Sequence, residues 1–406
     1  MDRFQHPVIV VGTGPTALGL ERTFGKRGID VFLISDERTP ADFSRYCKKN
    51  LRVDGVTYTK SVLESALRKV GKMCNETPVV YPTSDMVAMN LADLKDGLAD
   101  DFYFVVGSSD VVRTLVDKKK FYKILSQHGI SHPQTFFPAD ANETNVLASK
   151  LDYPIFVKPS ITQLFSRAFP RAGKGFVAKT PRELSYYYRL AVHHGIEVML
   201  QETIPGPASN SYQLEGYYNP KHSPLVVFAR QRFRIWPPDF GNTTLCASIP
   251  LEKLASERSV INRFLKTIGY AGLMSAEFKR DDRDGTLKLL EINARAWWHL
   301  WLSEKCGADI ALTSYLDAIG DVDASSQNEQ YEIGVKSMHL INDIRASADM
   351  FLTKRLSSRE WISSLKGKKC FTFYSRNDPL PFMVLPFFGW LQKVGQEYIT
   401  GRTRAR

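Results

Sequence analysis

Residues 275–293 read Ser-Ala-Glu-Phe-Lys-Arg-Asp-Asp-Arg-Asp-Gly-Thr-Leu-Lys-Leu-Leu-Glu-Ile-Asn, two segments of alternating polarity around a polar loop that ends at Gly285. This pattern is typical of a β-hairpin. A turn in the loop places Glu277 and Glu291 opposite each other on adjacent strands, with Asn293 on the same face. Facing carboxylates repel unless a cation bridges them, and two carboxylates with an amide suit Mg²⁺, with Mn²⁺ as an alternative. The segment predicts either a metal site or a solvated hairpin face.

The composition predicts a folded, reduced protein of two or three domains. A chain of 406 residues can bury several cores, and 43% hydrophobic with 12% aromatic residues excludes general disorder. No apolar stretch approaches the length of a membrane span, and the first apolar run is too short for a signal peptide. The cysteines are odd in number, lie far apart and form no Cys-x-x-Cys, which argues against a disulfide framework or zinc site. We therefore expect a cytoplasmic protein.

The net charge of +11 is concentrated in the last part of the chain, where residues 341–406 hold 12 Lys or Arg against 5 Asp or Glu. No nucleic-acid-binding module is recognisable, so we expect no nucleic-acid partner. The end of the chain places aromatic and apolar residues at helical spacing among basic ones. This predicts either peripheral contact with a membrane surface or, more commonly, a helix that packs on its own domain. The residues are Phe387, Phe388, Trp390, Leu391, Lys393, Val394, Tyr398, Arg402, Arg404 and Arg406.

The first 110 residues alternate strand and helix patterns, which predicts a doubly wound parallel sheet. Strands are expected at residues 7–11, 31–34, 79–82 and 102–106. Gly12, Gly14 and Ala17 follow the first strand with the spacing of a dinucleotide-binding loop, and Asp36 follows the second at the distance of a ribose ligand. This suggests a nicotinamide enzyme, but any such sheet needs small residues where its first strand turns into a helix.

The middle of the chain carries four further candidate sites. Lys158 ends an apolar strand, where a lysine suits a phosphate better than a core. Gly173 and Gly175 flank Lys174, so backbone N–H groups there could close over phosphate oxygens, although a flexible turn is the commoner explanation. Residues 201–206 resemble an interdomain hinge able to contact a purine and a ribose. Arginines at 230, 232 and 234 alternate along a strand, as either a solvated edge or an anion site.

Taken together, these motifs resemble the ATP-grasp superfamily, and within it the carboxylate–amine ligases related to D-aspartate ligase and to the halves of carbamoyl-phosphate synthetase. The resemblance spans about residues 5–325 and implies a Rossmann-like pre-ATP-grasp domain followed by a two-subdomain ATP-grasp α+β fold. We expect domains at 1–112, 113–205 (small subdomain with flap), 206–330 (large subdomain with the metal site) and 331–406 (basic extension). The motifs are Asp117-Lys118, residues 153–159, residues 201–206 and Glu277 with residues 291–295.

The resemblance also implies a role for each matching residue. Lys118 and Lys158 would hold ATP phosphates. Gln201 and Glu202 with the backbone of Thr203 and Ile204 would hold adenine and ribose, and the loop from Gly173 through Lys174 to Gly175 would be the flap. Glu277, Glu291 and Asn293 would bind Mg²⁺, and Arg295, with Arg230 and Lys158, would face the transferred phosphate. Candidate substrate contacts in the first domain are Gly12, Gly14, Thr83, Ser84 and Asp85.

Two positions depart from the family pattern. Ala294 stands where many relatives have proline, which removes a rigid turn but no ligand. The loop at 160–172 is longer and more apolar than a usual glycine-rich flap, so it fits a lid better than a phosphate loop. Trp297, Trp298 and His299 follow the metal motif, as either an aromatic wall beside the substrate or part of the core.

The implied reaction joins a small carboxylic acid to an amine through an acyl phosphate made from ATP, with Mg²⁺ as the metal cofactor. A homodimer is the expected assembly. Two other functions remain open from the residues alone. One is an NAD(P)-dependent oxidoreductase that uses the first glycine loop, which would leave Glu277, Glu291 and Asn293 without a role. The other is a nucleotide-binding protein without turnover.

Overall fold

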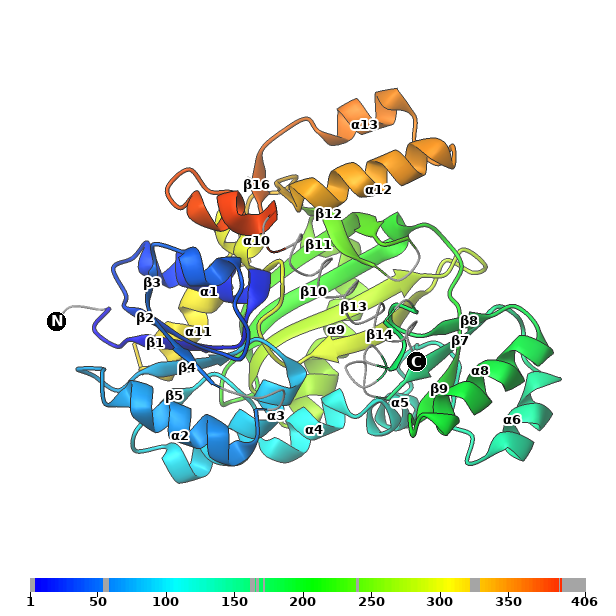
Figure 1. The fold of residues 1–406 in the computed structure, drawn as a ribbon, viewed down its shortest axis with the longest axis horizontal. Helices are drawn as coiled ribbons and strands as arrows, with labels where there is room; N and C mark the ends of the chain where they lie inside the picture. The colour runs from blue at the N-terminus through cyan, green and yellow to red at the C-terminus, as the bar shows by residue number, and fades with distance from the viewer. Residues whose placement is uncertain are drawn as a thin grey trace, which may run out of the picture.

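The computed structural model describes residues 4–53, 58–160, 165, 168–170, 172–238, 241–321, 329–386 and 388. These residues form sheets of five, four and seven strands. In Figure 1 the five-stranded sheet lies at one end, the four-stranded sheet at the other, and the seven-stranded sheet between them.

The five-stranded sheet is parallel, with the order β3-β2-β1-β4-β5. Val8 and Val10 of β1 face one hydrophobic core, while Ile9 and Val11 face the other, because successive side chains of a strand point to opposite faces. The predicted Rossmann-like domain is confirmed. Its elements are β1 (Val8–Val11), α1 (Gly14–Gly25), β2 (Val31–Ser35), η1 (Pro40–Phe43), β3 (Cys47–Arg52), α2 (Lys60–Gly71), β4 (Val79–Pro82), α3 (Asp85–Leu94), η2 (Lys95–Leu98) and β5 (Tyr103–Phe104).

The four-stranded sheet is antiparallel, with the order β6-β9-β7-β8. Helices α6 and α8 pack on it around a hydrophobic cluster of their own, centred on Val157, Leu184 and Leu200. Two helices connect it to the first domain, and Asp117 caps the second by accepting the N–H groups of Lys119 and Lys120. The elements are α4 (Ser109–Val116), α5 (Lys118–Gln127), β6 (Thr135–Phe136), α6 (Ala141–Ala148), β7 (Ile155–Pro159), β8 (Phe176–Ala178), α8 (Pro181–His193) and β9 (Val198–Glu202).

The seven-stranded sheet has the order β14-β13-β10-β11-β12-β15-β16 and is antiparallel except between β15 and β16. It shares both of its hydrophobic clusters with the first domain. The elements are η3 (Ala208–Asn210), β10 (Ser211–Tyr218), β11 (Pro224–Trp236), β12 (Asn242–Ser248), η4 (Leu251–Leu254), α9 (Ala255–Thr267), β13 (Gly272–Arg280), β14 (Leu287–Asn293), α10 (Leu300–Lys305), α11 (Ile310–Ala318), β15 (Lys336–Met338), α12 (Leu340–Leu352), α13 (Ser358–Ser364) and β16 (Lys369–Phe371).

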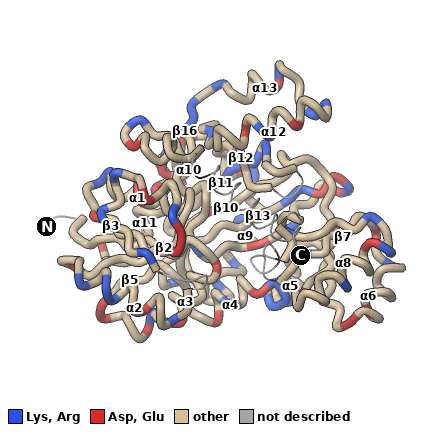
Figure 2. Tube along the Cα trace, viewed as in Figure 1, with Lys and Arg blue, Asp and Glu red and all other residues tan. Residues whose placement is uncertain are grey.

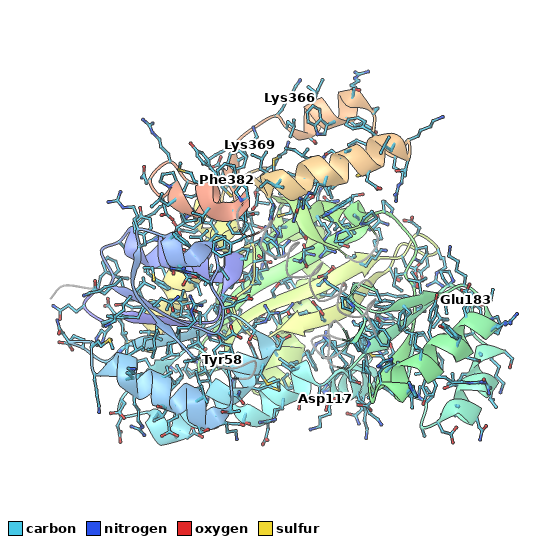
Figure 3. All side chains as sticks on the ribbon, viewed as in Figure 1. Tyr58, Asp117, Glu183, Lys366, Lys369 and Phe382 are labelled. Carbon is cyan, nitrogen blue, oxygen red and sulfur yellow. The ribbon has the colours of Figure 1, made fainter. Side chains whose placement is uncertain are left out.

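The carboxyl-terminal region is joined to the rest of the molecule by strands and buried ion pairs. It supplies β15 and β16 to the large sheet. Arg234 of β11 pairs with Asp343 of α12 at 2.7 Å, and Arg22 of α1 pairs with Asp378 at 2.9 Å. Figure 3 labels Lys366, Lys369 and Phe382 in this region. The predicted domain boundaries stay predictions, but the part of residues 331–386 that forms strands belongs to the large sheet.

The predicted amphipathic segment at the end of the chain lies almost entirely outside the described residues. Phe388 is described, and its ring centroid is 5.9 Å from that of Phe43, in the first domain. Among the helices of the described part of the chain, none has the length and apolar character needed to cross a bilayer.

Candidate active site

The predicted hairpin is β13 and β14, and Glu277 pairs directly with Glu291. Asn293 pairs with Ser275, so its side chain shares their face. The register shifts just beyond Glu277, which pairs Phe278 with Leu289. The predicted juxtaposition of two carboxylates and an amide is therefore present. β14 is an edge strand of the large sheet. In Figure 1 this edge lies toward the four-stranded sheet.

Each carboxylate of this pair contacts a cation. Arg232 Nη2 lies 2.8 Å from Glu277 Oε1, and Lys118 Nζ lies 3.3 Å from Glu291 Oε2. Asn293 Nδ2 donates to Glu291 Oε1 at 3.3 Å. The positive charge of Lys118, followed by those of two further lysines, holds the pKa of Glu291 well below its usual range. Glu291 therefore stays ionised at all physiological pH values.

Of the two further lysines, Lys158 lies in β7 of the four-stranded sheet and Lys174 lies in the turn before β8. Lys158 lies near the end of β7, and burial lowers the pKa of its amine while the charges of Glu291 and Glu277 oppose that shift. Lys174 follows Gly173, which has φ +66°. At Gly175 an added Cβ would lie 2.6 Å from the Val157 carbonyl oxygen, so glycine permits the close pairing of β8 with β7. Residues 161–164, 166, 167 and 171 of the predicted flap lie outside the described residues.

Arg295 connects the metal motif to the first domain. Its Nη2 donates to Asn293 Oδ1 at 2.9 Å, and its Nε donates to Asp85 Oδ1 at 2.8 Å. Asp85 is in the first turn of α3, which Ser84 caps by accepting the Val87 N–H. Asp85, one of the candidate substrate residues of the first domain, is therefore linked through Arg295 to the end of the carboxylate hairpin.

The first glycine loop has a structural reason for its composition. Gly12 has φ +120°, and a Cβ there would lie 1.8 Å from Thr83 Oγ1. Thr83 Oγ1 itself donates to the Val11 carbonyl at 3.0 Å. Gly14 also has a positive φ, of 72°, at the first position of α1. Close packing of β1 against the end of β4 thus accounts for Gly12, and the left-handed backbone accounts for Gly14, without a bound dinucleotide.

The predicted hinge lies at the end of β9. Gln201 is buried, and its Nε2 donates to Thr135 Oγ1 at 2.9 Å. The Glu202 carboxylate accepts from Lys288 Nζ at 2.7 Å, from Arg283 Nη2 at 2.8 Å and from the Gln134 N–H at 2.9 Å. These contacts, with Lys288 contributing most, lower the pKa of Glu202 against the opposing effect of burial. Glu202 therefore ties the large hairpin to the four-stranded sheet.

The three arginines of β11 have separate partners. β11 is the central strand of the large sheet, so the solvated-edge interpretation is wrong. Arg230 Nε donates to Glu215 Oε1 at 2.7 Å in a buried ion pair. Arg232 contacts Glu277, and Arg234 contacts Asp343. Sequence reasoning gave no individual role to Arg232, whose only signal was its alternation with Arg230.

One row of paired residues crosses the large sheet beneath the site. Glu291 pairs with Glu277, and Glu277 pairs with Gln213 of β10. Gln213 in turn pairs with Arg230. Gln213 was not predicted from the sequence, and its side chain is buried with no hydrogen-bond partner among the described residues. The polar face of the sheet thus continues from the carboxylate pair toward β11.

Solved structures with the same fold are known. The biotin carboxylase domain of Hydrogenobacter thermophilus 2-oxoglutarate carboxylase, crystallised with MgADP, ADP and bicarbonate, superposes with a TM-score of 0.63 and 17% identity over 82% of this chain and 74% of that one. N5-carboxyaminoimidazole synthetase from Staphylococcus aureus gives 0.59 and 14% over 81% and 80%. The L-amino acid ligase of Bacillus licheniformis gives 0.58 and 13% over 79% and 77%.

The chain has the fold of these solved structures, so the predicted fold class and the predicted resemblance are confirmed. No family model matches the chain. The D-aspartate ligase of Enterococcus faecium is 24% identical over 300 residues, which cover 71% of this chain and 70% of that protein.

Proposed function

We propose that this protein is an ATP-dependent carboxylate–amine ligase that forms an amide bond and releases ADP and phosphate. The observation that carries the proposal is an excess of positive charge around the facing carboxylates. Five cationic side chains of the described residues meet there, against the carboxylates of Asp85, Glu277 and Glu291. Such an excess suits a polyphosphate. The cations are Lys118, Lys158, Lys174, Arg232 and Arg295.

Glu277, Glu291 and Asn293 would hold Mg²⁺ in this reaction. The donor set fits, because it offers oxygens on one face of a hairpin and because nearby lysines, Lys118 above all, hold the pKa of Glu291 well below its usual range. In this site Mg²⁺ would neutralise charge on phosphoryl oxygens. Arg232 and Lys118 neutralise the same carboxylates in the structure described here, and they would turn toward phosphate when nucleotide binds.

ATP would lie between the four-stranded sheet and the hairpin. Lys118 and Lys158 would contact its phosphates, and the loop of Gly173, Lys174 and Gly175 would cover them. Gln201, Glu202, Thr203 and Ile204 would line the adenine and ribose site. Because the Glu202 carboxylate already accepts three hydrogen bonds, the backbone of Thr203 and Ile204 would make the direct contacts.

The acid substrate would lie between the hairpin and the first domain. Gly12, Gly14, Thr83, Ser84 and Asp85 would line this side, and Arg295 would reach both Asp85 and the transferred phosphoryl group. The contact of Arg295 with Asp85 and Asn293 supports this placement. Arg230 would act from beneath the site, since its Nε is held by Glu215 and its Nη1 has no partner among the described residues.

In the proposed reaction, an oxygen of the substrate carboxylate attacks the γ-phosphorus of ATP and ADP leaves. The amine then displaces phosphate from the acyl carbon. The protein supplies no nucleophile, so its contribution is to position the reactants and stabilise the developing charge.

The oligomeric state and the cellular location of the protein are two further proposals. The Hydrogenobacter thermophilus neighbour is described as a dimer, and we propose a homodimer here, to be tested by light scattering in solution.

We also propose cytoplasmic location with peripheral membrane contact through residues 381–406. The full chain should bind anionic vesicles, and deleting this segment should release it while ATP turnover continues. No binding by the full chain would contradict the membrane proposal.

The function is tested by phosphate release from Mg-ATP with a panel of amino acids and small carboxylic acids, with hydroxylamine present to trap activated acyl groups. Acid-dependent release with a hydroxamate product is expected, and it would identify the acid. ATP hydrolysis that no acid stimulates, without hydroxamate, would contradict the proposal.

A further inference from the structure

His299 is a buried residue just before α10, and its ring has one free nitrogen. Its Nδ1 lies 3.2 Å from Ser337 Oγ, which orients the imidazole. Its Nε2 is buried and has no hydrogen-bond partner among the described residues. A buried polar atom without a partner is costly, so it points to a group that is present only in a complex.

Strand pairing places His299 on the sheet face that carries the carboxylates. Ser337 of β15 pairs with Cys246 of β12, and Cys246 pairs with Arg232 of β11. Directly paired residues present their side chains on the same face. Arg232 contacts Glu277, so the side chains of Cys246 and Arg232 separate Ser337, the partner of His299, from the proposed metal ligands.

Other polar atoms on this face also have no partner within the described structure. They include both hydrogen-bonding groups of the Gln213 side chain, Oε2 of Glu215 and Nη1 of Arg230. Nε1 of Trp298 is likewise buried without a partner, and its ring lies 6.3 Å from that of His299. Buried donors and acceptors without a partner therefore occur on several elements around His299, as expected where a polar reactant binds.

Burial, together with nearby positive charges, keeps the His299 imidazole neutral. Burial lowers its pKa well below the usual value, and the positive charges of Arg230 and Arg232 and a smaller effect of His339 act in the same direction. The backbone of Thr243 favours the protonated ring instead. A neutral imidazole with a free nitrogen can accept a proton.

We propose that His299 Nε2 accepts the proton that the attacking amine loses, an inference that rests on the proposed ligase function. As the C–N bond forms, the nitrogen becomes positively charged and acidic. The C–O bond to phosphate breaks, inorganic phosphate leaves with the bonding electron pair, and the proton passes from nitrogen to Nε2 and then to solvent. Ser337 is the positioning residue that turns Nε2 toward the substrates.

The test compares two nucleophiles with the acid that the hydroxylamine assay identifies. Both nitrogens become positively charged when they attack the acyl carbon. The nitrogen derived from hydroxylamine is the more acidic and loses its proton readily to water, so its reaction depends less on a base supplied by the protein. His299→Gln should lower primary-amide formation from ammonium by about 100-fold near pH 7, the usual contribution of a general base. Hydroxamate formation should change less than about 2-fold. Relative to the unaltered protein, amide formation by the variant should recover as the pH rises, because hydroxide can then take the proton from the attacking nitrogen.

Two further variants make the result decisive. Ser337→Ala should show the same selective loss to a smaller degree, and it carries the test if His299→Gln does not fold. His193→Gln, on the exposed surface of α8, should change neither product. Equal loss of both products, or an unchanged rate of amide formation, would overturn the proposal. No hydroxamate from the unaltered protein would instead count against the ligase function.

Discussion

The four-stranded and seven-stranded sheets hold opposite halves of the candidate site and are stabilised differently. The four-stranded sheet carries Lys158 and Lys174 and packs with its helices around its own hydrophobic cluster. The seven-stranded sheet carries the carboxylates and shares two clusters with the first domain. Figure 2 shows basic residues at the start of α5, between the two sheets. Figure 3 labels Asp117 at that position and Glu183 on α8.

This difference indicates how the residues proposed for catalysis and for nucleotide binding are distributed between the two sheets. The residues proposed to position the acid and the metal, including Arg295, belong to one continuous body of two domains. The residues proposed to hold the nucleotide belong to a separately packed unit, joined to that body by the contacts of Glu202, Lys118 and Met199. We expect the large sheet to determine the rate of chemistry and the small sheet to determine nucleotide affinity. The following predictions separate the two.

Glu291→Gln should have the largest effect, on the large-sheet side. The change removes a charge but little volume, so Mg²⁺-dependent turnover should fall by about 1,000-fold, near the upper end for loss of one electrostatic stabiliser. The thermal midpoint should change little. Steady-state kinetics and thermal denaturation measure both, with Glu197→Gln, an exposed change, as control. Near-normal turnover would show that the carboxylate pair is not the metal site.

Asp343→Ala should strongly destabilise the large sheet. Asp343 accepts from Arg234 Nε at 2.8 Å, from Arg234 Nη2 at 2.7 Å and from Thr244 Oγ1 at 2.9 Å. Its loss leaves a buried guanidinium uncompensated, which costs about 3 to 5 kcal/mol of unfolding free energy. Asp349→Ala removes an exposed ion pair on the same helix and should cost less than about 1 kcal/mol. Similar losses in both variants, measured by chemical denaturation, would mean that α12 is not anchored as described.

Lys158→Ala should affect the small-sheet side and weaken ATP binding. The loss of one charge-assisted contact to phosphate corresponds to about a 10- to 100-fold weaker dissociation constant. Calorimetry or a thermal-shift titration with Mg-ATP measures it. Lys179→Ala, an exposed change beside the same sheet, should leave affinity unchanged. Unaltered affinity in Lys158→Ala would remove β7 from the proposed nucleotide site.

Asp281→Asn should have the smallest effect, at the hairpin turn where the two sheets meet. Asp281 is buried and accepts from Arg283 Nε at 2.8 Å and from Lys288 Nζ at 3.1 Å. These contacts, with Arg283 contributing most, lower the pKa of Asp281. The variant should lose about 1 to 2 kcal/mol of unfolding free energy near neutral pH.

The sign of the pH dependence follows from that lowered pKa. A carboxyl whose pKa is lower in the folded state stabilises the fold fully above its unfolded pKa of about 4, and this contribution disappears as the pH falls through the folded value. The difference between Asp281→Asn and the unaltered protein should therefore be constant from about pH 6 to 8 and shrink in acid. A difference that does not vary with pH would mean that the aspartate charge contributes nothing.

Much of the fold could be predicted because its signals are local. Strand alternation and turn residues located β1, β2, β4 and the hairpin β13–β14. β3 was missed because its sequence, Cys-Lys-Lys-Asn-Leu-Arg, is mostly polar, as suits an edge strand of this sheet. The roles of β15 and β16 were also missed, since three-residue strands are too short to show a period.

The site was predictable to a similar extent. The sequence by itself determined the facing carboxylates, because the pairing within one hairpin depends on the turn that joins its strands. Only the tertiary structure decided that Arg232 meets Glu277, that Arg295 reaches Asp85, and that His299 lies against Ser337. Those partners are between 38 and 210 positions apart. Their contacts depend on strand order and on the packing of separate domains, which no local pattern of residues specifies.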